Sequence, residues 1–205
     1  MTTSFVRAAT AAISLSALIS SPALPASSPA DQVPTPATMQ MSTPSFTDGG
    51  LAPDKHTCLV KEPVSPGFTW IDPPTKTVSY TLIFHVPDVH PNKGKDDSFH
   101  WAVWNIPGSA RSLAEGLPKK TPLPDGSQQT VHNGEIGYSP MCGRPGKKLH
   151  YMFELYALDV RLDLPPTAGR DEILNAMDGH IIGKNVYIGR FSRPGPLAPV
   201  AESSF

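Results

Sequence analysis

Residues 77–86 read Thr-Val-Ser-Tyr-Thr-Leu-Ile-Phe-His-Val, and residues 99–106 read Phe-His-Trp-Ala-Val-Trp-Asn-Ile. Both stretches are rich in β-branched and aromatic residues, which favour strands. Because successive side chains of a strand point to opposite faces, the first stretch places one apolar set on a single face: Val78, Tyr80, Leu82, Phe84 and Val86. The second stretch directs Trp101 and Trp104 to opposite faces, where we expect packing rather than a ligand-binding platform.

Further strands and one helix extend this pattern along the chain. Residues 149–158 form another aromatic and β-branched run, and a final strand is predicted at about residues 180–191. Between them, residues 170–177 carry acids in the first turn and one apolar face, and Gly179 can cap the end of a helix. The sequence therefore predicts a mainly β fold, a sandwich or a closed sheet, with one short helix near the C-terminus.

Length and composition favour a single domain. The chain has 205 residues, 39% of them hydrophobic, and its 24 prolines favour strands joined by rigid turns over long helices. We predict a folded domain at residues 39–193 and a flexible tail at residues 194–205. Because the formal net charge is only −1, no large field draws the protein to nucleic acid or to an acidic membrane. Any bound anion must be held by local geometry.

The N-terminal segment has the layout of a secretory signal peptide. Arg7 precedes a small and apolar run at residues 8–19, and small residues at Ala23 and Ala26 offer cleavage positions. We predict a signal peptide at residues 1–26, and hence a secreted or periplasmic protein; the alternative is a disordered leader without a targeting role. The run is too short for a transmembrane helix. Residues 27–38 are rich in Pro, Ala and Ser and are predicted to be a disordered linker.

The chain contains only two cysteines, Cys58 and Cys142. In an exported protein such an even pair is a candidate disulfide joining distant parts of the domain. Two cysteines alone leave open the alternative of two separate buried thiols.

No motif in the sequence predicts catalysis. The chain lacks the Gly-x-Ser-x-Gly elbow, the His-Glu-x-x-His pair and the Gly-x-x-x-x-Gly-Lys phosphate loop, so we expect no enzyme, no catalytic residue and no cofactor. A metal site at His85, Asp88 and His90 is disfavoured because the two histidines lie on opposite strand faces. His150 and Glu154 share one face of a predicted strand, and we expect them to form an exposed pair.

Several landmarks occur in an order that resembles one known family. They are Cys58 followed by Ser65-Pro66 and Trp70, Val86-Pro87-Asp88, residues 99–107, residues 137–142 and residues 151–159. Over roughly residues 42–193 the chain resembles the bacterial branch of the phosphatidylethanolamine-binding proteins, also called Raf kinase inhibitor-like proteins. The resemblance implies a large antiparallel sheet packed on a smaller one, with a helix near the C-terminus.

The resemblance also implies a small pocket at the ends of the central strands. In the family this pocket binds phosphate-like and carboxylate anions, including phospholipid headgroups. His100 matches the family's pocket histidine, and Tyr151 matches a tyrosine that offers a phenolic donor. Asp88 matches the second acid of the family's Asp-Pro-Asp motif and could orient a histidine or a turn.

Two departures from the family's pattern make the expected pocket more apolar. Val86 stands where the family has the first acid of Asp-Pro-Asp, and Leu149 replaces a histidine. Arg144 could compensate by reaching the pocket mouth with a guanidinium suited to phosphate or carboxylate. The predicted ligand-binding residues are therefore Asp88, His100, Arg144 and Tyr151, with no metal ligand.

Two functions remain open at this point. The first is a non-catalytic binding protein that holds a small anionic ligand or a phospholipid headgroup. The second is an extracytoplasmic protein-interaction module that inhibits or modulates a partner enzyme such as a protease or a kinase. In the second case the contact surface would be the loops at about residues 92–97 and 140–145.

Overall fold

The computed structural model describes Met1, residues 38–132 and residues 134–196. The predicted signal peptide after Met1, nearly all of the predicted linker and most of the predicted tail lie outside these residues. Within them, no helix is long and apolar enough to span a membrane. The strands, in chain order, are β1 (Gln40–Ser42), β2 (Gly50–Leu51), β3 (Phe68–Ile71), β4 (Ser79–Val86), β5 (Ser98–Pro107), β6 (Ser112–Leu113), β7 (Gln128–Gln129), β8 (Val131–His132), β9 (Glu135–Ile136), β10 (Lys148–Leu158) and β11 (Ile181–Ser192). The helices are η2 (Asp54–His56), η3 (Pro91–Lys93) and α1 (Arg170–Met177).

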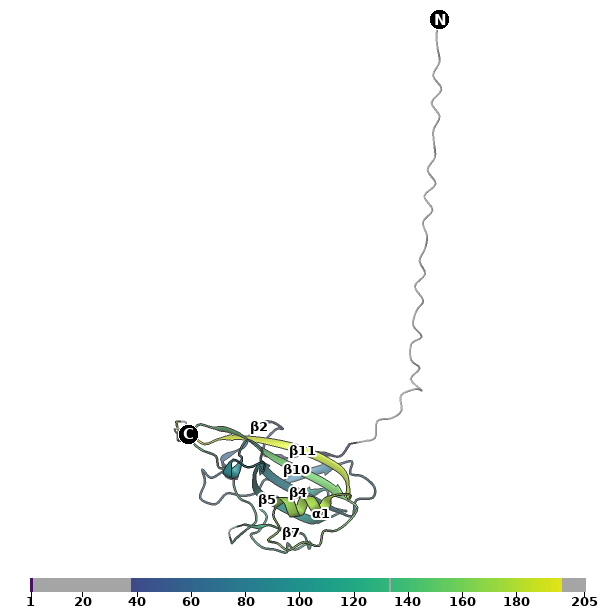
Figure 1. Cartoon of the computed structure of the whole chain (residues 1–205). Coiled ribbons are helices and arrows are strands. Elements are labelled where there is room, and N and C mark those ends of the chain that lie inside the picture. Colours follow the sequence, from purple (N-terminus) through teal and green to yellow (C-terminus); the bar gives the residue numbers. More distant parts are fainter. Residues whose placement is uncertain (2–37, 133, 197–205) are drawn as a thin grey trace. The chain divides into compact units, whose positions relative to one another are not determined.

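The larger sheet has the strand order β2-β11-β10-β4-β5-β7 (Figure 1). Its neighbouring strands are antiparallel except at one edge, where β2 runs parallel to β11. A smaller antiparallel sheet has the order β1-β3-β6, and β8 and β9 form a separate pair. The predicted fold class, a larger sheet, a smaller sheet and one short helix, is confirmed; the parallel edge strand was not expected.

The main core lies between the two sheets. The predicted apolar face of β4 contributes Tyr80, Leu82, Phe84 and Val86 to this core. From the smaller sheet, the Trp70 ring lies 5.1 Å from the Tyr80 ring. The Phe68 ring lies 4.9 Å from that of Phe153 in β10, measured between ring centroids. Burial of these aromatic side chains is the main favourable contribution to folding.

The opposite face of the larger sheet is covered by α1, which Figure 1 shows in front of the sheet. Ile173 and Met177 of α1 pack on Trp104 in a second apolar cluster, whereas Trp101 belongs to the core between the sheets. The two tryptophans therefore point to opposite faces, as predicted. The helix has its predicted bounds, and Gly179 follows it with a positive φ of 77°, a conformation that glycine adopts without strain.

A buried group of charged side chains lies on the α1 side of the sheet. Glu154 of β10 accepts hydrogen bonds from Lys184 Nζ at 2.6 Å and from the Tyr156 hydroxyl at 2.9 Å. The two ring nitrogens of His85 lie 3.3 Å from Glu154 Oε2 and 2.6 Å from Asp97 Oδ2. Burial acts to raise the pKa of Glu154, but the hydrogen bonds and charges of His85 and Lys184 outweigh it and lower the pKa to about 2. Glu154 is therefore an ionised, buried carboxylate.

This arrangement corrects the expectation of an exposed pair between His150 and Glu154. His150 is exposed, but Glu154 is buried and directed to partners in β4 and β11. Across residues 38–132 and 134–196, no group of three or more His, Cys, Asp or Glu side chains is placed to hold a metal ion.

Candidate ligand-binding site

A cavity of about 540 Å³ lies at one end of the larger sheet. It is formed where β4 ends and where β5 and β10 begin, together with the loops that follow β4 and precede β10. All four predicted ligand-binding residues line it: Asp88, His100, Arg144 and Tyr151. The remaining lining residues are Val86, Val89, His90, Ser98, Cys142, Gly143, Pro145, Lys147 and Leu149.

A β-bulge directs His100 toward this cavity. Phe84 pairs with Trp101 and the next residue, His85, pairs with Phe99, so His100 is the extra residue of β5. Such a bulge re-aims a side chain relative to the regular alternation of the strand. The His100 ring lies 5.2 Å from the Phe84 ring, on the side of the core between the sheets. Its Nδ1 is 3.4 Å from the carbonyl oxygen of Ser139.

Tyr151 is a buried donor at the cavity wall. Its hydroxyl faces the backbone of Cys142 but completes no hydrogen bond with any described residue. Burial raises the pKa of Tyr151 to about 12, with the Cys142 backbone opposing and the charge of Asp88 adding to the rise. The hydroxyl is therefore protonated at neutral pH. A buried donor without an acceptor costs about 1–3 kcal/mol, a cost that a ligand oxygen would remove.

Gly143 allows the cavity loop to lie close to β10. A Cβ atom at this position would lie 2.5 Å from Leu149 Cδ1, which is closer than carbon atoms approach without a shift. The same Cβ would lie 3.6 Å from the Tyr151 hydroxyl. A larger residue at this position would require the Leu149 side chain to shift.

Asp88 is already engaged by a neighbouring histidine. Its Oδ2 accepts hydrogen bonds from the His150 backbone N–H at 2.6 Å and from His150 Nδ1 at 3.0 Å. Asp88 thus orients a histidine, one of the two roles expected for it, and the histidine is His150. Among the described residues that line the cavity, Asp88 is the only carboxylate.

Two exposed cations lie in the loop before β10. Arg144 and Lys147 both line the cavity, and the Lys147 backbone N–H donates to the Arg144 carbonyl at 3.2 Å. Lys147 Nζ also lies 3.4 Å from the Asp88 carbonyl oxygen. Sequence reasoning identified Arg144 but missed Lys147, which had no motif to distinguish it from a solvated loop lysine.

The predicted disulfide between Cys58 and Cys142 is confirmed, with an S–S distance of 2.05 Å. It fixes the loop of Arg144 to the segment that follows η2. Backbone hydrogen bonds support the same contact, because the Cys58 N–H donates to the Met141 carbonyl and the Met141 N–H donates to the His56 carbonyl. The cavity loop is therefore held by both covalent and hydrogen-bonded links.

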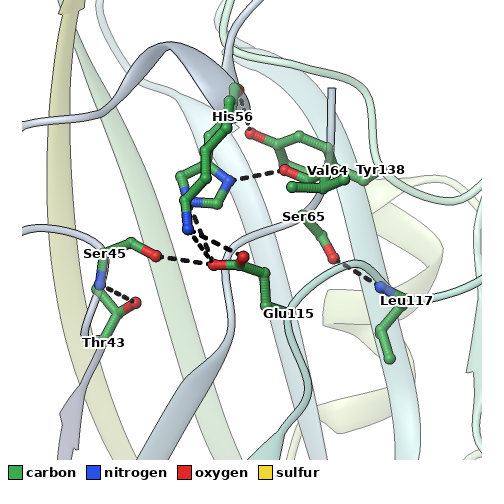
Figure 2. Close-up of polar contacts among 9 residues, drawn as sticks. Thr43, Ser45, His56, Val64, Ser65, Glu115, Leu117 and Tyr138 are labelled. Atoms are coloured by element: carbon green, nitrogen blue, oxygen red, sulfur yellow. Dashed lines mark hydrogen bonds and ion pairs between the residues drawn. The ribbon is translucent and has the colours of Figure 1, made fainter. Parts of the chain in front are cut away.

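The segment before Cys58 is anchored by the buried His56, shown in Figure 2. His56 Nδ1 donates to the Val64 carbonyl at 2.8 Å, and the Tyr138 hydroxyl donates to the His56 carbonyl at the same distance. Burial lowers the pKa of His56, although the Val64 hydrogen bond and the charge of Glu115 act in the opposite direction. His56 is therefore a neutral structural anchor, which indirectly positions the disulfide.

Comparison with known proteins agrees with this architecture. The family model described as phosphatidylethanolamine-binding protein matches residues 42–192, which is most of the chain. The chain belongs to this family. It is 39% identical to a UPF0098 protein of Methanothermobacter thermautotrophicus over 157 residues, which cover 76% of this chain and 99% of that protein. A UPF0098 protein of Aquifex aeolicus is 35% identical over 160 residues, covering 77% of this chain and 90% of that protein.

Solved structures of phosphatidylethanolamine-binding protein homologues share the fold. A homologue from Chlamydia trachomatis superposes with a TM-score of 0.66 at 34% identity, covering 76% of this chain and 98% of that chain. The structure of E. coli YbcL, described as a new member of the mammalian family, gives a TM-score of 0.67 at 21% identity. That comparison covers 76% of this chain and 99% of YbcL, and it supports the fold alone.

In this member of the phosphatidylethanolamine-binding protein family, the cavity wall combines apolar and cationic groups. Val86 and Leu149, the two departures noted from the sequence, are buried residues of the cavity lining. Neither side chain can form a hydrogen bond. The polar side chains of the cavity lining are therefore those of His100, Tyr151, the two cations of the loop before β10, Asp88, His90 and Ser98.

Proposed function

We propose that the chain is a non-catalytic binding protein that holds a small phosphate- or carboxylate-bearing ligand in this cavity. The observation that carries the proposal is the composition of the cavity wall. His100, Arg144, Lys147 and Tyr151 supply hydrogen-bond donors, and the single carboxylate among the described lining residues is already paired with His150. The two exposed cations at the cavity, Arg144 and Lys147, favour an anion, and a guanidinium suits both phosphate and carboxylate oxygens.

The absence of catalysis is part of the same proposal. A thiolate is the reactive form of cysteine, and Cys142 of the cavity wall is bound to Cys58 as a disulfide. Cys142 is therefore not available as a nucleophile. A binding role needs only a shaped cavity with a few fixed donors, which matches the geometry of the site.

Titration calorimetry with inorganic phosphate and with acetate tests the proposed anion site. We expect His100→Ala and Arg144→Gln each to weaken binding about 10-fold or more, because each removes a hydrogen bond to a charged group. Arg161→Gln is a matched control, since Arg161 is exposed and does not line the cavity. Equal affinity of wild type and both cavity variants would show that the anion site is wrong, and a role in binding a protein partner through the loops would then take precedence.

We propose further that the protein is exported and that its mature form begins after Ala23 or Ala26. The layout of the N-terminal segment supports this, and a disulfide suits an oxidising compartment. Intact-mass measurement of protein from the periplasmic or secreted fraction should give the processed mass, and alkylation without reductant should modify no cysteine. Recovery of the uncleaved chain alone from the cytoplasmic fraction would contradict export.

A further inference from the structure

Four residues of the cavity lining are apolar. Val86 and Leu149 are almost fully buried in its wall, and Val89 and Pro145 add half-buried surface. None of these four side chains carries a hydrogen-bonding group. Placing a charged or strongly polar group against them costs free energy because the group loses water without gaining a partner. The part of a ligand that lies against these side chains therefore has to be apolar.

The charged residues of the cavity lining disfavour a positive charge on the ligand. The carboxylate of Asp88 already accepts two hydrogen bonds from His150, at 2.6 and 3.0 Å. Arg144 and Lys147 line the same cavity with their positive charges. An ammonium group entering the cavity would meet two cations and one carboxylate, whose Oδ2 is already bonded to His150, so it would gain little net attraction.

We propose that the cavity selects organic anions that have an uncharged apolar body. These anions are carboxylates or phosphate monoesters of aryl or branched alkyl groups. It selects them over inorganic anions and over zwitterions that carry an ammonium. This selectivity rests on the proposed anion-binding function and adds the class of ligand. The cavity volume of about 540 Å³ lies within the range of sites for small organic molecules. The anionic head lies against the donors, and the apolar body lies against Val86, Val89, Pro145 and Leu149.

Three probes that share one phosphate group separate the possibilities: phenylphosphate, inorganic phosphate and phosphoethanolamine. Titration calorimetry of the wild-type chain should give phenylphosphate an affinity at least about 10-fold higher than that of phosphate, since burying an aromatic ring contributes about 1.5–3 kcal/mol. Phosphoethanolamine should bind no more tightly than phosphate, because its ammonium meets two cations against one carboxylate.

Variants at the apolar wall test the cause of the selectivity. Val86→Asp and Val89→Asp each add an unpaired carboxylate, which should weaken phenylphosphate binding and strengthen phosphoethanolamine binding, reversing their order. Val86 is fully buried and its variant can fail to fold, whereas Val89 is only half-buried. Val78→Asp is the matched control, because Val78 is 46% exposed and does not line the cavity. This control should keep the wild-type order.

The possible failures are distinguishable. If the three probes bind wild type within about threefold of one another, or if phosphoethanolamine binds most tightly, the proposed selectivity is wrong and anion binding stands. An unchanged order of probes in a folded Val89→Asp variant would also contradict the assigned cause. If none of the probes binds, the anion-binding function itself is wrong, and the selectivity is wrong with it.

Discussion

Replacing both Cys58 and Cys142 with serine is expected to lower the free energy of unfolding by about 4–5 kcal/mol. The disulfide joins two residues that are 84 positions apart in the sequence. A link across so long a loop removes much conformational entropy from the unfolded chain and so stabilises the folded state. In the native state the same contact is also held by backbone hydrogen bonds at Met141. The folded structure should therefore persist without the bond, and the loss of stability should arise mainly in the unfolded chain.

Urea unfolding of wild type and of the Cys58→Ser/Cys142→Ser variant, each with and without reductant, measures this effect. Reductant should bring wild type to the stability of the double variant and should leave the variant unchanged. A loss below about 1 kcal/mol on reduction would contradict the expected role of the disulfide.

The larger sheet and its helix could be predicted because their sequences are long enough to show a period. The alternation at residues 77–86 identified the core face of β4, including Tyr80 and Phe84, and the helix at residues 170–177 has its predicted bounds. The strands of the smaller sheet have only two to four residues, which is too short for a periodic pattern. The parallel pairing of β2 with β11 likewise depends on a partner far along the chain.

The cavity could be predicted in part because strand ends bring distant residues together. Asp88 follows the end of β4, whereas His100 and Tyr151 lie near the beginnings of β5 and β10, so the topology places all three at one end of the sheet. The direction of the His100 side chain depends on the bulge in β5, which regular alternation does not reveal. The role of Lys147 depends on how its loop folds over the cavity.

Glu154 shows where a local pattern was misleading. Its position on the same strand face as His150 suggested an exposed pair, but β11 and β4 supply buried partners that the sequence of β10 does not contain. The Glu154 side chain is only 7% exposed, whereas that of Glu115, which pairs with Lys55, is 41% exposed. Both carboxylates lie within 3 Å of a lysine Nζ. The two carboxylates therefore differ strongly in burial, whereas the two lysine side chains are similarly exposed, at 42% and 49%.

Glu154→Gln is expected to lower the free energy of unfolding at neutral pH by about 1.5–3 kcal/mol, because it removes a buried, ionised acceptor of the hydrogen bonds from Lys184 and Tyr156. Glu115→Gln, the matched control, should cost about 1 kcal/mol or less, because water screens an exposed pair.

The pKa of Glu154 is lowered in the folded state to about 2 from its ordinary value of 4.5, so the contribution of this carboxylate to stability is complete above pH 4.5 and is lost as the pH falls toward 2. Urea unfolding at neutral pH and through this acidic window should show the difference between wild type and Glu154→Gln shrinking with falling pH. Equal losses for the two variants at neutral pH would contradict the assigned importance of the buried carboxylate.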